Sequence, residues 1–212
     1  MRPFIFVLAG VNGAGKSSVG GALLADQGLS WFNPDTYARE LVQQLGLDPA
    51  EANSRAWAHS KSGLESATAN ASSYAFETTL GGTTMTQLLM QAARTHSVVM
   101  LYCGLSSPEL HIERVAQRVA HGGHSIPEAK IRERWNASRL NLIKLLPVLS
   151  KLQVLDNSAQ VQPGQSIPDP VVVLEMDAGR IIVPDPLDAA AMQAVPQWAH
   201  AVSEAAFRLP PR

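Results

Sequence analysis

The chain has 212 residues, of which 46% are hydrophobic and 17% are charged, a composition typical of a globular protein with one sizeable core. Because 17 Lys and Arg residues face 18 Asp and Glu residues, the net charge is only −1, and we expect neither a nucleic-acid nor a membrane partner. The single cysteine, Cys103, excludes a disulfide framework and a Cys-rich zinc module and favours a cytoplasmic location.

Strands and helices are expected to alternate along most of the chain. Residues 4–9 form a continuous aromatic and β-branched run, which is typical of the central strand of a parallel sheet and too short to span a bilayer. Further strands are expected at residues 29–33, 73–76, 97–103 and 152–155. Helices are expected at residues 16–26, from 35 onward, and at 49–71, 84–94, 108–120 and 125–146. Gly28 would stop the first helix, and Ser125 with Glu128 has the spacing of a capping box for the last.

This alternation predicts an α/β fold with a mainly parallel, five-stranded sheet. The sequence changes character after the fifth strand. The expected elements there are a hairpin at residues 171–174 and 180–183 and a terminal helix at 188–207. We therefore divide the chain into a core at residues 1–160 and a C-terminal extension at 161–212 that packs on the core.

A phosphate-binding loop is the strongest motif. Residues 10–17 match G-x-x-x-x-G-K-[ST], directly after a strand and directly before a helix, a context that argues against an ordinary glycine-rich turn. Lys16 would reach the β- and γ-phosphates of a nucleoside triphosphate, and Ser17 would ligate Mg²⁺. The residues expected to bind the nucleotide are Gly10, Asn12, Gly13, Ala14, Gly15, Lys16, Ser17, Ser18 and Asn157. For Asn157 and its neighbour Asp156, an Asx turn is the favoured alternative.

Two carboxylates follow strands at the edge of the sheet where ligands bind in open α/β folds. Asp35 could accept a proton from an acceptor hydroxyl, or it could cap the helix that follows, and the sequence leaves both roles open. Glu77 could bind Mg²⁺ through water or hold a substrate hydroxyl, with a solvated loop carboxylate as the weaker alternative.

A lid is predicted at about residues 114–139. Two helices joined by Gly122 and Gly123 each present arginines on one face, a pattern that suits closure over phosphates. We expect Arg118 and Arg132 to face the phosphates, and Arg114 and Arg134 to belong to a solvated charged face.

Other conspicuous side chains have simpler interpretations. The histidines at 121 and 124 lack further metal ligands at suitable spacing, so we expect them to contact phosphate or solvent. Trp31, Trp57 and Tyr74 are expected to pack rather than stack on a ligand, and Trp198 is expected to dock the terminal helix.

An ordered series of motifs over residues 4–158 resembles the zeta-toxin-like P-loop kinases, and more closely their short bacterial branch labelled predicted ABC-type ATPase. The motifs are the phosphate loop, FNPD at 32–35, AFETTL at 75–80, SPEL at 107–110, RVAQRV at 114–119, GGH at 122–124, Pro127 with Ile131 and Arg132, and DNS at 156–158. The resemblance implies a nucleotide-kinase-like, three-layer fold and ATP-dependent phosphorylation of the 3′-hydroxyl of the amino sugar in UDP-N-acetylglucosamine. It also implies an antitoxin protein as partner.

The resemblance carries over roles for particular residues. Lys16 and Ser17 would serve ATP and Mg²⁺, and Asp35 would activate the sugar hydroxyl. The residues that would hold the substrate are Glu77, Thr78, Thr79 and His124. Arg118 and Arg132 would be the lid arginines, although the alignment there is approximate and Arg134 could replace Arg132.

Two alternatives remain beside this interpretation. The acceptor could be another nucleoside, dinucleotide or sugar. The protein could instead be a regulatory ATPase that acts through a protein partner, but the sequence has no Leu-Ser-Gly-Gly-Gln signature, which an ABC ATPase needs.

Overall fold

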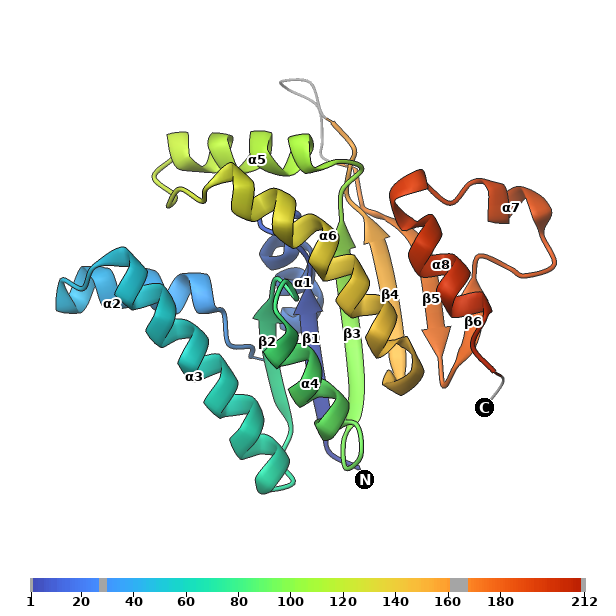
Figure 1. The fold of residues 1–212 in the computed structure, drawn as a ribbon, viewed down its shortest axis with the longest axis horizontal. Coiled ribbons are helices and arrows are strands. Elements are labelled where there is room, and N and C mark those ends of the chain that lie inside the picture. The colour runs from blue at the N-terminus through green and yellow to red at the C-terminus, as the bar shows by residue number, and fades with distance from the viewer. Residues whose placement is uncertain (1, 27–29, 161–167, 211–212) are drawn as a thin grey trace.

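The computed structural model describes residues 2–26, 30–160 and 168–210, and its centre is a six-stranded sheet in the order β2-β1-β3-β4-β5-β6 (Figure 1). The strands are β1 (Phe4–Ala9), β2 (Tyr74–Thr78), β3 (Ser97–Gly104), β4 (Lys151–Asp156), β5 (Val171–Asp177) and β6 (Arg180–Val183). The first four are parallel, whereas β5 and β6 are antiparallel to their neighbours. The predicted mainly parallel α/β sheet is therefore confirmed.

Three details of the predicted sheet are wrong. It has six strands rather than five, because the predicted hairpin pairs with β4 and extends the same sheet. β1 is an interior strand, but it lies one place from the edge rather than at the centre. In place of a strand at 29–33, the described residues 30–33 contain a single bridge, between Phe32 and Phe76. A strand cannot continue here because Pro34 lacks an N–H group and begins a helix.

Eight α-helices occur in the described residues. They are α1 (Lys16–Asp26), α2 (Pro34–Leu45), α3 (Pro49–Ala69), α4 (Thr83–Ala92), α5 (Pro108–Ala120), α6 (Glu128–Leu145), α7 (Ala189–Gln193) and α8 (His200–Phe207). The predicted capping box does not form, because Pro127 precedes α6 and no side chain caps it. The predicted terminal helix is broken at Pro196, which cannot donate a helical hydrogen bond. Gly28, the predicted stop of α1, lies outside the described residues.

Helices cover both faces of the sheet. On one face Ile5 and Val7 of β1 pack in a cluster with side chains of α3, α4, α6 and α8. On the other face Leu8 packs with Leu101 and with Leu110 of α5, and α1 lies behind the sheet in Figure 1. The helical hairpin of α2 and α3 projects beside β2, and α5 lies across the carboxyl ends of the strands. This arrangement leaves the loops at those carboxyl ends between two helical pairs.

The C-terminal elements are joined to the same core. Trp198 is buried, as predicted, and its ring lies so close to Gly104 of β3 that a Cβ at this glycine would overlap it. Arg139 of α6 donates a hydrogen bond to the carbonyl oxygen of Trp198 at 3.1 Å. Within the described part of the chain, no helix is long and apolar enough to cross a membrane.

Candidate active site

The phosphate loop connects β1 to α1, and three of its glycines have positive φ angles. The angles are 139° at Gly10, 84° at Gly13 and 82° at Gly15, in a region that L side chains rarely adopt. A Cβ at Gly10 would overlap the carbonyl oxygen of Cys103, and one at Gly13 would lie 2.8 Å from the carbonyl oxygen of His111. The glycines therefore let the loop turn tightly between β3 and α5, as binding of a phosphate by backbone N–H groups requires.

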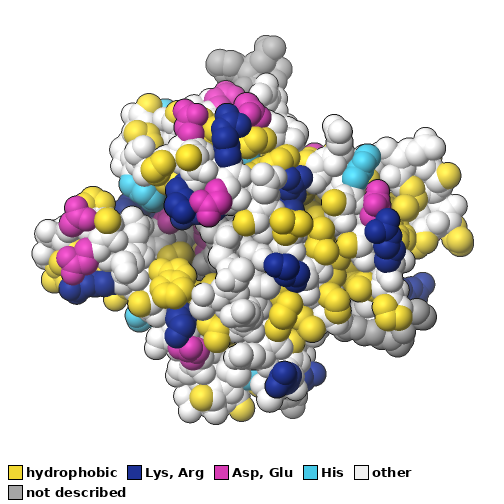
Figure 2. All heavy atoms as spheres, in the orientation of Figure 1, with side chains coloured by type: hydrophobic (Ala, Val, Ile, Leu, Met, Phe, Trp, Pro, Cys, Tyr) yellow, Lys and Arg dark blue, Asp and Glu magenta, His cyan; other side chains and the backbone are white. Residues whose placement is uncertain are grey.

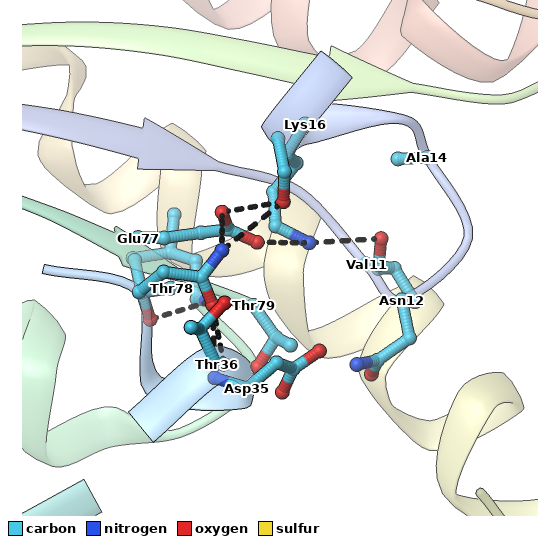
Figure 3. A network of polar contacts seen from close by, with 12 residues as sticks. Val11, Asn12, Ala14, Lys16, Asp35, Thr36, Glu77, Thr78 and Thr79 are labelled. Atoms are coloured by element: carbon cyan, nitrogen blue, oxygen red, sulfur yellow. Dashed lines mark hydrogen bonds and ion pairs between the residues drawn. The ribbon is translucent and has the colours of Figure 1, made fainter. Parts of the chain in front are cut away.

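Glu77, at the end of β2, is the centre of a buried polar network beside the loop (Figure 3). Lys16 Nζ lies 3.4 Å from Glu77 Oε1 and 3.4 Å from the carbonyl oxygen of Val11. Ser17 Oγ donates to Glu77 Oε2 at 2.9 Å, and Asn33 Nδ2 donates to the same oxygen at 3.0 Å. Both Lys16 and Glu77 are about 95% buried, since their exposed fractions are 6% and 5%. The weaker alternative for Glu77, a solvated loop carboxylate, is therefore wrong.

The side chains around Ser17 fit a magnesium ion. The Ser17 hydroxyl and the Glu77 carboxylate are oxygen donors, which Mg²⁺ prefers. In the part of the chain that the structure describes, no three His, Cys, Asp or Glu side chains gather as a metal-binding group. Mg²⁺ commonly takes one or two protein oxygens and completes its shell with water and phosphate oxygens, so Ser17 and Glu77 would be enough to hold it.

Asp35 is not the cap of α2. Asn33 fills that position, since its Oδ1 accepts from the N–H groups of Asp35 at 2.9 Å and Thr36 at 3.1 Å. The Asp35 carboxylate instead lies 3.6 Å from Nη1 of Arg118 and lines a cavity next to the phosphate loop. The carboxylate therefore lies at the cavity beside the loop, paired with Arg118.

A cavity of about 280 Å³ separates α3 from the turn between α5 and α6. It brings together six of the predicted site residues, namely Asn12, Asp35, Glu77, Thr78, Thr79 and His124. In Figure 2 a hollow is visible between the α2–α3 hairpin and the α5–α6 pair. The lining extends from Asn12 of the phosphate loop to Asn53 and Trp57 of α3.

Several lining residues were missed by the sequence analysis. Trp57 of α3 lines the cavity and is 48% exposed, whereas the sequence suggested only a packing role for it. Asn53 lies one turn before it, and Lys130 lines the opposite side. The signal was weak, because a tryptophan in an Ala-rich helix does not reveal which face it occupies.

Two threonines, Thr78 at the end of β2 and Thr79 directly after it, shape the turn that follows. Thr78 Oγ1 accepts from the N–H of Leu80 at 3.0 Å, and Thr79 Oγ1 accepts from the N–H of Gly81 at 3.4 Å. Leu80 has a positive φ of 53°. Because each hydroxyl oxygen accepts from the backbone, each hydroxyl proton can still be donated toward the cavity.

The lid arginines are placed differently from the prediction. Arg118 Nη1 faces Asp35 and its Nη2 donates to the carbonyl oxygen of His124 at 3.4 Å, so it lies at the site. Arg132 pairs with Glu109 of α5 at 2.6 Å, and both side chains are exposed. Arg134 Nη1 instead donates to Asn12 Oδ1 at 2.7 Å and lines the cavity.

Helix geometry explains why Arg134 lines the cavity while Arg132 pairs with Glu109. Residues two apart on an α-helix point about 200° apart, so Arg132 and Arg134 occupy opposite faces of α6. Arg134 follows the buried Ile131 by three residues and precedes the buried Ser138 by four, which puts it on the inner face. Those spacings were readable from the sequence and favour Arg134 over Arg132.

Buried His111 of α5 was also missed. Burial lowers its pKa to about 4, and the neighbouring Lys16 and Arg114 act in the same direction. The ring is therefore neutral at pH 7, and its Nδ1–H donates to the carbonyl oxygen of Asn12 at 2.9 Å, because a carbonyl can only accept.

A second cavity, of about 660 Å³, lies on the other side of the phosphate loop. Ser18, Arg114 and Asn157 line it, and Asn157 Nδ2 donates to the carbonyl oxygen of Ala14 at 2.9 Å. The expected Asx turn occurs at Asp156, whose Oδ1 accepts from the N–H of Ser158 at 3.0 Å. Asn157 thus supports the loop while Asp156 forms the turn.

Comparison with known families identifies the domain. A family model described as AAA domain matches residues 5–139, well over half of the chain. The chain belongs to this AAA-domain family. The match begins in β1 and ends in α6, so it includes the phosphate loop, Asp35, Glu77, α5 and part of α6.

Solved structures resemble the AAA-domain chain in fold. A chain of the AvrRxo1-ORF1:AvrRxo1-ORF2 complex with sulphate ions matches with a TM-score of 0.64 and 18% sequence identity. The match covers 92% of the present chain but only 65% of the AvrRxo1 chain. A chain from the PezAT toxin–antitoxin system of Streptococcus pneumoniae matches with a TM-score of 0.55 and 18% identity, over 73% of the present chain and 68% of the PezAT chain. A candidate kinase from Chloroflexus aurantiacus matches with a TM-score of 0.52 and 18% identity, over 63% of the present chain and 78% of the kinase chain.

No curated protein matches the AAA-domain chain in sequence. The structural likenesses establish a kinase-like P-loop fold, which supports nucleotide binding at the loop. The AvrRxo1 complex has also been solved with ATP.

Proposed function

We propose that the protein is a kinase that uses Mg²⁺ and ATP to phosphorylate a hydroxyl group of a nucleotide sugar, with UDP-N-acetylglucosamine as the leading acceptor. The observation that carries this proposal is the position of Asp35. Its carboxylate lies on the wall shared by the phosphate loop and the cavity beside α3, where an acceptor hydroxyl would meet the γ-phosphate.

The reaction needs a proton acceptor beside the attacking hydroxyl. Asp35 takes the hydroxyl proton while the acceptor oxygen forms its bond to the γ-phosphorus and the bond to the β–γ bridging oxygen breaks. Lys16 binds the β- and γ-phosphates, and Ser17 with Glu77 would hold Mg²⁺. The ion would supply charge neutralisation on the transferring group.

Two arginines flank the same point. Arg118 leaves Asp35 when phosphates compete for its guanidinium, and this frees the carboxylate as a base. Arg134, rather than Arg132, is the second lid arginine in this proposal. Arginine forks bind phosphate oxygens in two places at once, which suits the charge that develops during transfer.

The cavity suits an acceptor that carries rings and phosphate. Trp57 offers an exposed aromatic face, and Lys130 and Arg134 offer positive charge on the opposite side. A nucleotide sugar matches both features, because its base and sugar supply rings for the aromatic face and its diphosphate supplies negative charge. Similarity in fold to chains from a toxin–antitoxin system supports a protein antitoxin as partner in the cytoplasm.

The first test is mass spectrometry of purified protein incubated with Mg²⁺-ATP and a panel of nucleotide sugars, nucleosides and dinucleotides. We expect one added phosphate on UDP-N-acetylglucosamine, and none with Lys16→Ala. Phosphate on another panel member would replace the acceptor and keep the chemistry. Formation of ADP without any modified acceptor would favour a regulatory ATPase.

The Asp35→Asn variant tests the proton acceptor. Because the amide cannot take the proton, transfer should fall by about 10³-fold while ATP still binds. Asp35→Glu, which keeps a carboxylate, should recover part of the rate. Wild-type turnover by Asp35→Asn would remove this residue from the chemistry.

A further inference from the structure

Asn12 occupies an unusual position in the phosphate loop. It is a variable residue of the motif, yet its side chain is only 4% exposed. Its two oxygens accept from two different helices, since the backbone carbonyl accepts from His111 of α5 and Oδ1 accepts from Arg134 of α6. One loop residue therefore joins both lid helices to the phosphate loop.

The contact with α5 fixes the backbone of Asn12. His111 is 1% exposed, and the neighbouring Gly13 lies so close to its carbonyl oxygen that a Cβ would come within 2.8 Å. The helix thus packs directly on the loop, and the Asn12 side chain leaves the loop in a fixed direction.

The contact with α6 fixes Arg134 from two sides. Its Nη1 donates to Asn12 Oδ1 at 2.7 Å, and its aliphatic stem rests on Gly81, where a Cβ would lie 2.8 Å from Arg134 Cγ. Hydrogen bonds to a charged guanidinium are stronger than those between neutral groups. Nη1 contacts Asn12, and this leaves the other donors of the fork to face the cavity that Arg134 lines.

The end of the loop that Asn12 occupies is the γ-phosphate end. The cavity that Asn12 and Arg134 line also contains Asp35 and Glu77, whereas Ser18 and Asn157 line the cavity on the other side of the loop. An arginine held by Asn12 therefore lies where the third phosphate of a triphosphate would extend.

We propose that Asn12 is a positioning residue that holds Arg134 in place for the γ-phosphate before the nucleotide arrives, so that the site distinguishes a triphosphate from a diphosphate. The inference rests on the proposed binding of ATP. It does not require a particular acceptor, and it acts through Arg134 rather than through contact with the reacting atoms.

Calorimetry with Mg²⁺-ADP and with the magnesium complex of the β,γ-imido analogue of ATP tests it. Asn12→Ala and Arg134→Ala should each weaken binding of the triphosphate analogue by about tenfold, as expected for loss of a charge-assisted hydrogen bond, and leave ADP affinity within about twofold. The double variant should bind the analogue no more weakly than Arg134→Ala alone, because the two residues act as one unit.

Three further variants sharpen the result. Asn12→Asp keeps the oxygen that accepts from Arg134, so it should retain the preference for the triphosphate even if its charge weakens both nucleotides. Asn136→Ala makes the same change on the exposed part of α6 and should alter neither affinity. Arg134→Lys keeps the charge but loses the planar fork, and it should recover only part of the preference.

Other outcomes would overturn the proposal. Additive losses in the double variant would show that Asn12 does not act through Arg134, and an equal loss of ADP and analogue would mean that Asn12 only supports the loop. Unchanged binding in Asn12→Ala would have the same effect. Failure of the acceptor panel would refute the proposed kinase activity and leave this binding test intact, so the two results are distinguishable.

Discussion

Trp57 is an exposed aromatic side chain in the cavity that we propose as the acceptor site. It lies on α3, 48% exposed, on the wall of the cavity that also holds Asp35. Trp rings on a protein surface usually have an apolar neighbour or a ligand to cover them, and a flat ring beside positive charge suits a base or a sugar.

We expect Trp57→Ala to raise the acceptor KM by about tenfold and to leave the ATP KM unchanged, because stacking on one ring contributes about 1–3 kcal/mol. Trp57→Phe should keep most of the affinity. Steady-state kinetics with varied acceptor measures the effect, and Leu45→Ala on the exposed side of α2 is the matched control. An unchanged acceptor KM in Trp57→Ala would return this residue to a packing role.

At the scale of elements, α5 is joined to the phosphate loop through a neutral histidine. The pKa of His111 is about 4 in the folded protein, against an ordinary value of 6.5. Between these values the unfolded chain binds more protons than the folded protein, so stability is fully present above about pH 6.5 and falls as the pH decreases toward 4.

We therefore expect the free energy of unfolding to fall by about 2 kcal/mol more between pH 7 and pH 5 in the wild type than in His111→Asn. The asparagine amide can still donate to Asn12, and it does not titrate. Urea unfolding at the two pH values measures the difference. The same slope in wild type and His111→Asn would contradict the assignment.

The site could be predicted from sequence where a motif fixes both residue and geometry. Lys16 and Ser17 follow from the phosphate loop, and Glu77 from its place after a strand. The two roles considered for Asp35, proton acceptor and helix cap, could not be separated, because the sequence does not show that Asn33 caps the helix. The choice between Arg132 and Arg134 was open from the motifs alone, and the spacing of Arg134 from the buried Ile131 is what favours it.

At the scale of the whole molecule, the C-terminal elements share the core of the phosphate-loop region. β5 pairs with β4, and the ring of Trp198 packs on Gly104 of β3. A buried aromatic ring at such a joint should make the two parts unfold together.

We expect Trp198→Ala to lower the free energy of unfolding by about 3–5 kcal/mol and to keep a single transition, because a large cavity opens in a shared core. Urea unfolding followed by circular dichroism measures it. Ile182→Ala on the exposed edge strand β6 should change stability by about 0.5 kcal/mol or less. Two separate transitions would show instead that the C-terminal elements fold as a unit of their own.

The sheet was predictable in its parallel part and less so at its edges. Continuous apolar runs identify β1 and β3, since both faces of these strands are covered. The pairing of the hairpin with β4 depends on contacts between residues far apart in the chain, which local patterns do not encode. At residues 30–33 the cause is local instead, because Pro34 ends the strand pattern and begins a helix.

The burial of Glu77 against Lys16 has a consequence for how the nucleotide arrives. The ammonium already has a counter-charge, so an incoming triphosphate must exchange with a carboxylate that repels it. A nucleotide that carries its own divalent cation brings the partner that Glu77 and Ser17 need, and the exchange becomes a rearrangement of ions rather than a collision of like charges. We therefore expect the magnesium complex of ATP to bind more tightly than bare ATP, and calorimetry with and without Mg²⁺ measures the difference.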